Sequence, residues 1–465
     1  MLTADPDLHL LRRATYGATP ELVADIRARG SQAWLDGQLN PGSINDSACD
    51  AVVAKFPLVS ASLATLNGLA APSEASNQLV QCAIARQVWS KRQLFEVMVE
   101  FWSNHLNVLC PHPATYREKP VEDRSVIRQF ALGRYENMLL ADARSPAMLA
   151  YLMNDESELD DPNENYGREL LQLHTVTPSA GYTEAHVRDS ALVLTGRTSD
   201  GKGSFVYKPE WHHVGTVRIL GWSSANASAT GGLATSDSYL RYLARHESTA
   251  RNIARKLAVR FVSDTPPASL VDALAETYLD TGTAIVPVLR RLFASTEFAE
   301  SIGQKARRPC EDVVASARAM AMQPPTGSNV QGVIDLVNHA NNFGNGPYGA
   351  EPPSGYPDVL AGWWSVGSTL GRCNMHRNFT RGFPAGLPRP PLMNLLAGPP
   401  MANYGAMIDR LTTTLTQQVF RADHRTALLT YSALSAGGAY DQRTVDKCLP
   451  DLCELVLNSP YRTLR

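Results

Sequence analysis

The stretch from Asp160 to Pro178, DDPNENYGRELLQLHTVTP, is the strongest guide to the fold of this chain. Asn163 and Glu164 follow a proline, which suits the first turn of a helix, where the helix dipole stabilises carboxylates. The run stops before Pro178, as helices commonly do. The expected apolar stripe of this helix consists of Tyr166, Leu170, Leu171 and Leu173. The stretch therefore predicts a short helix with an unusually dense set of polar side chains.

Those polar side chains allow two interpretations. Glu164 lies four residues before Arg168, and Asn165 lies four before Glu169, so each pair shares one stripe of a helix. Such a face is often a solvated ion-pair ladder, which stabilises a protein by only a few tenths of a kcal/mol. It is otherwise the wall of a cleft, with Glu164 or Glu169 as a general acid or base. In that case Arg168 and Asn165 would orient the substrate.

Composition excludes several classes of protein. The chain has 465 residues, of which 44% are hydrophobic and 19% charged, as in globular proteins. Its net charge of −2 does not suit a general nucleic-acid binder. No apolar run approaches the ~20 residues that span a bilayer. The N-terminal residues MLTADPDLHLLRRATYG lack the pattern of a signal peptide, so a cytoplasmic location is expected.

Seven cysteines are too few for a disulfide scaffold in a chain of this length. We expect most of them to be small buried side chains. Cys448 and Cys453 lie close enough in the sequence to approach each other, and their redox state stays open.

Periodicity predicts a mainly α-helical fold. Apolar residues recur at helical spacing from about Asn77 to Val108, and this run ends in EFWSNHLNV, which carries Glu100 and His105. Short alternating runs at Ser204–Tyr207 and Thr216–Leu220 predict a small β-hairpin near 203–220. No repeat and no linker interrupts the chain. We therefore expect residues 1–465 to form one large multi-helix domain with a small hairpin insertion.

A metal site is a second hypothesis. Glu100 and His105 are five residues apart, as are Glu169 and His174, which turns the members of each pair about 140° apart on a helix. No HExxH motif is present. A metal would therefore need ligands from separate elements, and the candidates are His105, His174 and His213. Buried, hydrogen-bonded histidines are the alternative.

Other motifs are weak. No GxSxG motif and no Walker loop occurs, and the single GxGxxG match at 344–349 contains Pro347 and reads as a turn. Trp363 and Trp364 follow a Gly- and Pro-rich loop at 343–358. They would either stack on a flat ligand such as a sugar or anchor the loop to the core. Arg372 is grouped with them as a substrate contact. The sequence leaves any cofactor unknown.

A series of motifs resembles one bacterial family of unknown function, "DUF eighteen-hundred". In chain order these motifs are HLLRRATYGATP, EFWSNHLNV, YRE, SPAMLAYL, PNENYGRELLQLHTV, GYT, ALVLTGR, His213-Val214-Gly215, HESTARNIARKLAVRFV and PPSGYPD followed by WW and R. The resemblance covers about residues 5–460. It implies a mostly helical protein. It also implies a gene neighbour with sulfatase-like features that is often exported by the twin-arginine route.

The chain departs from the family pattern at two places. Gly344 is followed by Asn345 where a glutamine is usual, and His212-His213-Val214-Gly215 lacks an aspartate that the family element carries. Without that aspartate, the second place is a weaker candidate for a metal or acid role.

Three functional hypotheses follow from the residues and the resemblance. The first is a hydrolase that acts on an extracellular or cell-envelope polysaccharide. Its catalytic residues would be Glu164, Glu169, Arg168 and His174, and its substrate contacts Asn165, Tyr166, His105, Trp363, Trp364 and Arg372. The second is a metal-dependent enzyme with histidine ligands. The third is a non-enzymatic partner or chaperone of an exported sulfatase-like protein, with which this chain would be exported as a passenger.

Overall fold

Helices α6 (Ser73–Trp89) and α7 (Gln93–His105) lie near the centre of the molecule in the computed structural model, which describes all residues from 1 to 465. The sequence pattern predicts one continuous helix here, and the structure breaks it at Ser90. The side chain of Asp46 accepts hydrogen bonds from Ser90 Oγ (2.6 Å) and Lys91 N (2.8 Å). Because these bonds hold Ser90 in an extended conformation, α7 starts in a new direction.

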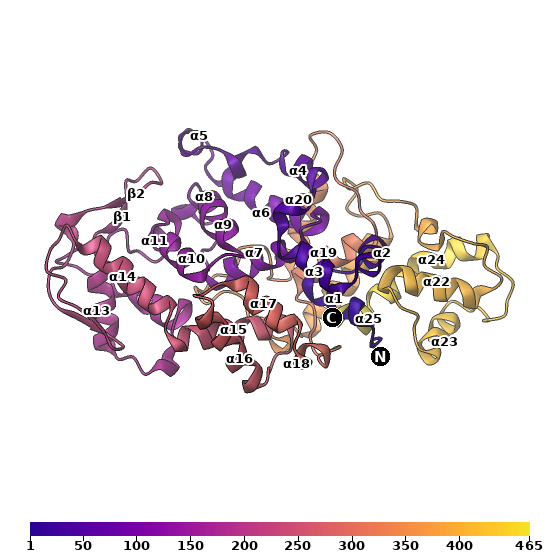
Figure 1. The fold of residues 1–465 in the computed structure, drawn as a ribbon. Coiled ribbons are helices and arrows are strands. Elements are labelled where there is room, and N and C mark those ends of the chain that lie inside the picture. The colour runs from indigo at the N-terminus through magenta and orange to yellow at the C-terminus, as the bar shows by residue number, and fades with distance from the viewer.

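The N-terminal helices pack beside this pair (Figure 1). Their bounds are α1 Pro6–Ala14, α2 Pro20–Arg29, α3 Ser31–Gln38, α4 Ser47–Val53 and α5 Leu63–Asn67. α1 and α2 each begin with a proline behind a side-chain cap, Asp5 and Thr19 respectively. Among these short helices, α1 and α3 pack against α7, and α4 packs against α6.

Two π-helical turns interrupt the next part of the chain. The first, Asp123–Ile127, joins α8 to α9, and the second, Leu170–His174, continues α12. The helices here are α8 Lys119–Glu122, α9 Arg128–Phe130, α10 Tyr135–Asp142, α11 Pro146–Tyr151, α12 Glu164–Glu169 and α13 Glu184–Leu194. The expected helix after Pro162 is therefore present, but its second half is wound more widely than an α-helix.

The β-structure expected near 203–220 consists of two hairpins. β1 (Arg197–Ser199) pairs antiparallel with β2 (Phe205–Tyr207), and β3 (Val217–Ile219) with β4 (Trp222–Ser224). The two runs predicted as partners, which became β2 and β3, do not pair with each other. The tight turn at Leu220 and Gly221, both with positive φ, closes the second hairpin. A Leu-Gly turn is a weaker sequence signal than Asn-Gly, which explains the missed strand β4.

The rest of the chain is helical. Its helices are α14 Gly232–Ala244, α15 Glu247–Phe261, α16 Ala268–Asp280, α17 Ile285–Phe293, α18 Thr296–Ala299, α19 Pro309–Ala319, α20 Gln331–Asn342, α21 Val366–Thr380, α22 Tyr404–Thr416, α23 Ala422–Tyr431, α24 Gln442–Leu457 and α25 Pro460–Thr463. α13, α14 and the strands form one end of an elongated molecule, and α22 to α24 form the other (Figure 1). The fold is mainly α, as predicted.

One continuous cluster of buried apolar side chains runs from Leu8 to Tyr461. The two ends of the chain lie near each other (Figure 1). No helix combines the length and apolar character needed to cross a bilayer. All seven cysteines are unpaired. Cys448 and Cys453 share α24 five residues apart, which directs their side chains to different faces.

Candidate functional site

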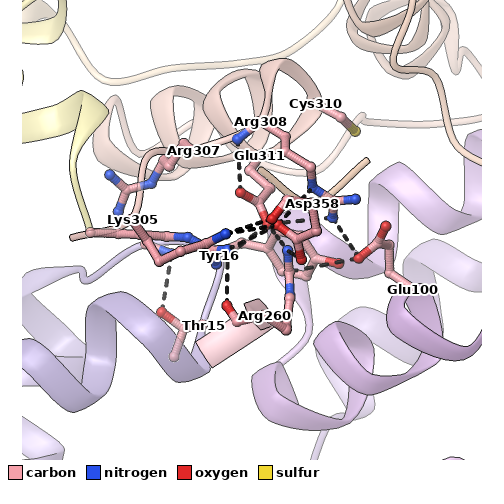
Figure 2. A network of polar contacts seen from close by, with 12 residues as sticks. Thr15, Tyr16, Glu100, Arg260, Lys305, Arg307, Arg308, Cys310, Glu311 and Asp358 are labelled. Carbon is pink, nitrogen blue, oxygen red and sulfur yellow. Dashed lines mark hydrogen bonds and ion pairs between the residues drawn. The ribbon is translucent and has the colours of Figure 1, made fainter. Parts of the chain in front are cut away.

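A buried network of charges joins four separate parts of the fold at Arg260 of α15 (Figure 2). The Arg260 guanidinium contacts Glu311 of α19. It also lies 3.6 Å from Glu100 of α7 and 3.5 Å from Asp358, which follows the proline-rich loop. The side chain of Arg260 is 1% exposed, so these carboxylates replace water around its charge.

Three more cations belong to the same network, and two of them, Lys305 and Arg308, are labelled in Figure 2. Arg308 lies 2.7 Å from Glu100 and 3.5 Å from Glu311. Lys305 lies 2.6 Å from Asp264 and 3.4 Å from Asp358. Arg465 lies 3.4 Å from Glu311 and 3.9 Å from Asp358. Glu100, Glu311 and Asp358 are therefore each shared by more than one cation.

These cations keep two of the buried carboxylates ionised. Burial raises the pKa of Glu311, but Arg260, Arg465 and Arg308 outweigh burial and hold that pKa well below its ordinary value. Burial also raises the pKa of Asp358, but the charges of Arg308, Arg260 and Lys305 outweigh burial and lower that pKa to about 2. Both groups are anions at neutral pH.

Two cavities meet at this network. We call the first, of about 40 Å³, the tyrosine cavity, because Tyr16, Tyr348 and Tyr356 line it. We call the second, of about 270 Å³, the lysine cavity, because Lys256 lines it. The lysine cavity is therefore the roomier of the two. The residues that line both cavities are Glu100, Asn104, Arg308 and Tyr356.

The tyrosine cavity is lined mainly by groups that already have partners. Arg128 donates to both carboxylate oxygens of Glu96, at 2.6 and 3.0 Å. Tyr348 donates to Asp123 at 3.0 Å. Ser103 and Arg308 are the exceptions, because the Ser103 hydroxyl and Nε of Arg308 are buried without a hydrogen-bond partner. This cavity therefore offers few free polar groups to a ligand.

The lysine cavity contains a lysine held by a neutral histidine. Nε2 of His105 lies 3.1 Å from the carbonyl oxygen of His174, which can only accept, so Nε2 carries the proton. Nδ1 then presents its lone pair and accepts from Lys256 Nζ at 2.8 Å. Burial lowers the pKa of His105 well below its ordinary value and that of Lys256 to about 8. Lys256 forms no ion pair with a carboxylate.

Asn104 and Asn107 of the EFWSNHLNV motif hold the proline-rich loop against α7. Asn104 Nδ2 donates to the Tyr356 carbonyl (2.9 Å), and its Oδ1 accepts from Tyr356 N (2.7 Å). Asn107 Nδ2 donates to two carbonyls of the loop. Gly355 has a φ of +72°, and a Cβ there would lie 2.2 Å from the Asn104 carbonyl oxygen. Glycine is therefore required for this close approach.

The polar face of α12 lies away from these cavities. Arg168 pairs with Glu164 at 3.1 Å and with Glu184 of α13 at 2.7 Å, and all three side chains are substantially exposed. Asn165 donates to the Leu152 carbonyl, and Tyr166 is fully buried. Glu169 is partly buried, which raises its pKa. Glu164 and Arg168 thus form the solvated ion-pair face, and Glu169 joins neither cavity.

His174, by contrast, lies beside the lysine cavity at the end of the second π turn. Its ring centroid is 6.3 Å from that of His105, and both ring nitrogens are buried without a partner. Burial, with a smaller effect of Lys256, lowers its pKa to about 3. The structure brings together His105 and His174, but not the carboxylates expected with them.

The histidines do not form a metal site in this geometry. His213 lies between the two hairpins, where its backbone N–H donates to Thr195 Oγ1. No group of three or more His, Cys, Asp or Glu side chains is arranged to hold a metal ion. The ligand set of His105, His174 and His213 is therefore wrong, because His213 belongs to a different part of the fold.

The two tryptophans and Arg372 lie on the other side of Asp358. Trp363 Nε1 donates to the Pro357 carbonyl at 2.8 Å, which anchors the loop, while Trp364 is 56% exposed. Arg372 is buried, and its Nε lies 3.1 Å from Asp312. With Lys305 and Arg307 these three line a small cavity that shares Arg308 and Asp358 with the lysine cavity.

Sequence reasoning missed most residues of the lysine cavity. Lys256 and Arg260 belong to HESTARNIARKLAVRFV, where four cations recur on one helix, and Asp358 ends PPSGYPD. Their presence in motifs of the family was the available signal. Glu100 and Asn104 come from EFWSNHLNV. Three of the motifs that carry the resemblance therefore meet at one site.

Comparison with known proteins gives the class of this chain. A family model described as "Protein of unknown function (DUF1800)" matches residues 9–463. The chain belongs to this family over nearly its whole length. Neither a curated protein nor a solved structure matches it.

Proposed function

We propose that the protein is a hydrolase that acts on an extracellular or cell-envelope glycan, with the lysine cavity as its active site. The observation that carries this proposal is that two carboxylates, Glu100 and Asp358, line the same cavity. Glycoside hydrolysis generally uses two such groups, one to protonate the leaving oxygen and one that stays ionised. Glu164 and Glu169 do not share a cavity in this way.

Each carboxylate would have a distinct role. Asp358 is held as an anion by Arg308, Arg260 and Lys305, which suits a group that stabilises the positive charge of an oxocarbenium-like transition state. Glu100 is 22% exposed and lines both cavities, so a bound substrate and solvent can reach it. Glu100 would serve as the general acid toward the leaving oxygen, and water would complete hydrolysis.

Neutral polar groups around the carboxylates suit a polyhydroxylated substrate. Tyr356 forms part of the wall of both cavities, and Ser354 and Asn252 line the lysine cavity. Sugars bind through hydroxyl hydrogen bonds and through contacts of their apolar faces with aromatic rings. These features support a glycan rather than an apolar ligand.

The proposal is tested by turnover of a set of envelope polysaccharides, measured as released reducing ends. Glu100→Gln and Asp358→Asn should each lower kcat at least 100-fold on the confirmed substrate. Glu164→Gln on the exposed face is the matched control and should retain full activity. Glu100→Asp keeps the charge next to Arg308 and checks that loss of activity is not loss of folding. Normal turnover by a folded Glu100→Gln variant would refute the assignment.

A second candidate function is binding of an exported sulfatase-like partner protein. It is supported by an uncharged surface at residues 360–371, where Leu360, Trp364, Val366 and Leu370 are exposed. Exposed apolar groups this close together are typical of protein interfaces. Co-purification with that partner should be lost in a Trp364→Glu, Val366→Glu double variant. Export as a passenger requires the protein to leave the cytosol with the partner, and detection in the cytosol alone contradicts it.

A further inference from the structure

The lysine cavity contains more positive charge than its own carboxylates balance. Three cations, Arg255, Lys256 and Arg308, line it together with Glu100 and Asp358. Both carboxylates are already engaged by Arg260, Arg308 and Lys305 of the buried network. Arg255 and Lys256 are therefore left without an anionic partner.

The free donors of these two cations face an open space. Arg255 is exposed and forms no hydrogen bond or ion pair, whereas its neighbour one turn earlier, Arg251, pairs with Asp272 at 2.5 Å. Lys256 gives one N–H to Nδ1 of His105, which leaves its other N–H groups for a ligand. Nε of Arg308 is buried without a hydrogen-bond partner. An unpaired buried donor is costly unless a ligand satisfies it.

We propose that Arg255, Lys256 and Arg308 form a subsite for an oxyanion, which is a sulfate ester or a carboxylate of the substrate. This inference rests on the proposed function, because it names the substrate as an anionic glycan. Arg308 offers a planar donor and Lys256 a compact point charge, a combination common in oxyanion sites.

His105 is a positioning residue for this subsite. Its Nε2–H is fixed by the His174 carbonyl, which also accepts from the Tyr135 hydroxyl at 2.5 Å. Nδ1 of His105 therefore accepts a hydrogen bond from Lys256, which directs the ammonium group toward the cavity. A neutral histidine holds the lysine and leaves its positive charge in place, whereas a carboxylate would neutralise that charge.

The charge state of Lys256 links anion binding to pH. Burial lowers the pKa of Lys256 to about 8, and a bound anion would raise it again. The protein should therefore take up protons when the anion binds near pH 8, and affinity should fall as pH rises through 8. The titratable and charged groups that surround Lys256 are Glu100, His105, His174, Arg255, Arg308 and Asp358.

The experiment is calorimetric titration of the full chain with sodium sulfate and, separately, sodium glucuronate at constant ionic strength. Sulfate binding alone identifies a sulfate-ester subsite, glucuronate binding alone a carboxylate subsite, and binding of both an oxyanion subsite of either kind. Lys256→Met should weaken binding at least tenfold and Arg255→Gln about threefold. Arg251→Gln removes a charge from the same helix outside the cavity and should change nothing.

A second readout excludes a nonspecific charge effect. Titrations at pH 8 in buffers of different ionisation enthalpy should show uptake of roughly half a proton per anion. Lys256→Arg should retain binding within a few-fold but lose this uptake, because arginine stays charged. Absence of binding by both anions, or equal losses in Arg251→Gln and Lys256→Met, would overturn the proposal. Anion binding without glycan turnover would instead refute the proposed hydrolase and leave the subsite standing.

Discussion

Lys256 Nζ lies 2.8 Å from Nδ1 of His105, and no carboxylate neutralises that ammonium. The arrangement joins α15 to the end of α7 and, through the His174 carbonyl, to the π turn that follows α12. The helix carrying the NENYGRELL motif thus contributes a backbone carbonyl to the site, while its charged side chains face solvent. Through this carbonyl the segment contacts His105, which in turn contacts Lys256.

Lys256 should be the most reactive lysine side chain of the protein at pH 8. Since burial lowers its pKa to about 8, about half of it is neutral there, against less than ~1% of a lysine with the ordinary pKa of ~10.4. Brief treatment with acetic anhydride followed by peptide mass spectrometry should show Lys256 acetylated before the other lysines. Sulfate should protect it. If Lys256 reacts no faster in the folded than in the unfolded protein, its pKa is not lowered.

Glu311→Gln should destabilise the fold severely. The substitution keeps the hydrogen bond from the Arg308 backbone N–H (2.9 Å) but removes the negative charge that Arg260, Arg308 and Arg465 share. An uncompensated buried charge costs about 3–5 kcal/mol. Urea denaturation at pH 7 measures the loss of unfolding free energy. Glu184→Gln breaks the exposed pair with Arg168 and is the control, with no measurable effect expected.

Acid should destabilise the protein partly through His174. Burial lowers the pKa of His174 to about 3, whereas an unfolded histidine has a pKa of ~6.5. Between these values the unfolded state binds the proton and the folded state does not. The free energy of unfolding therefore falls as pH falls from about 6.5 to 3, by up to ~1.4 kcal/mol per pH unit for this group.

His174→Leu removes this titration and should flatten the pH dependence of unfolding between pH 6.5 and 4. Leu171→Ala in the same π turn is the matched control, because it costs about 2–5 kcal/mol at every pH without changing the slope. If the free energy of unfolding of His174→Leu falls with pH as steeply as that of the parent protein, His174 is not held neutral by burial.

Local patterns predicted the helical class but not where helices bend. The apolar spacing from Asn77 to Val108 is continuous, and the break at Ser90 depends on Asp46, which is far away in the sequence. The π turn at Leu170–His174 likewise has no signature in the residues themselves. It changes the direction of His174 relative to the α-helical wheel from which its position was inferred.

The site was only partly predictable for a related reason. Spacing showed that Glu164 and Arg168 pair, but not that the pair faces solvent rather than a cavity. Arg260, Glu311 and Asp358 interact through tertiary packing alone, since they come from α15, α19 and a loop. His105 was predicted as a site residue because its motif is dense in polar groups, and it lines the lysine cavity. Its partner Lys256 belongs to another helix, and no spacing rule connects them.

Gly167 of the NENYGRELL motif should not tolerate alanine. A Cβ at this position would lie 2.8 Å from the backbone nitrogen and 3.2 Å from the Cα of Ala191 in α13. Both neighbours are backbone atoms of a helix and cannot move as a side chain can. α12 must therefore shift, which lowers the free energy of unfolding by about 1–3 kcal/mol. Helix propensity alone predicts the opposite sign, because alanine stabilises a helix interior by roughly 0.5–1 kcal/mol relative to glycine. The sign of the change in unfolding free energy therefore distinguishes steric crowding against α13 from helix propensity.

Gly367→Ala is the matched control for this prediction. Gly367 also lies within a helix, α21, and no atom lies within 4 Å of a Cβ built there, so alanine should be neutral or stabilising. Urea denaturation of both variants gives the comparison. Since α12 leads into the turn whose His174 carbonyl orients His105, a shifted α12 should also weaken sulfate binding in Gly167→Ala and leave it unchanged in Gly367→Ala. A Gly167→Ala protein as stable as the parent would show that α12 and α13 can separate freely, and that close backbone packing is not why glycine occupies this position.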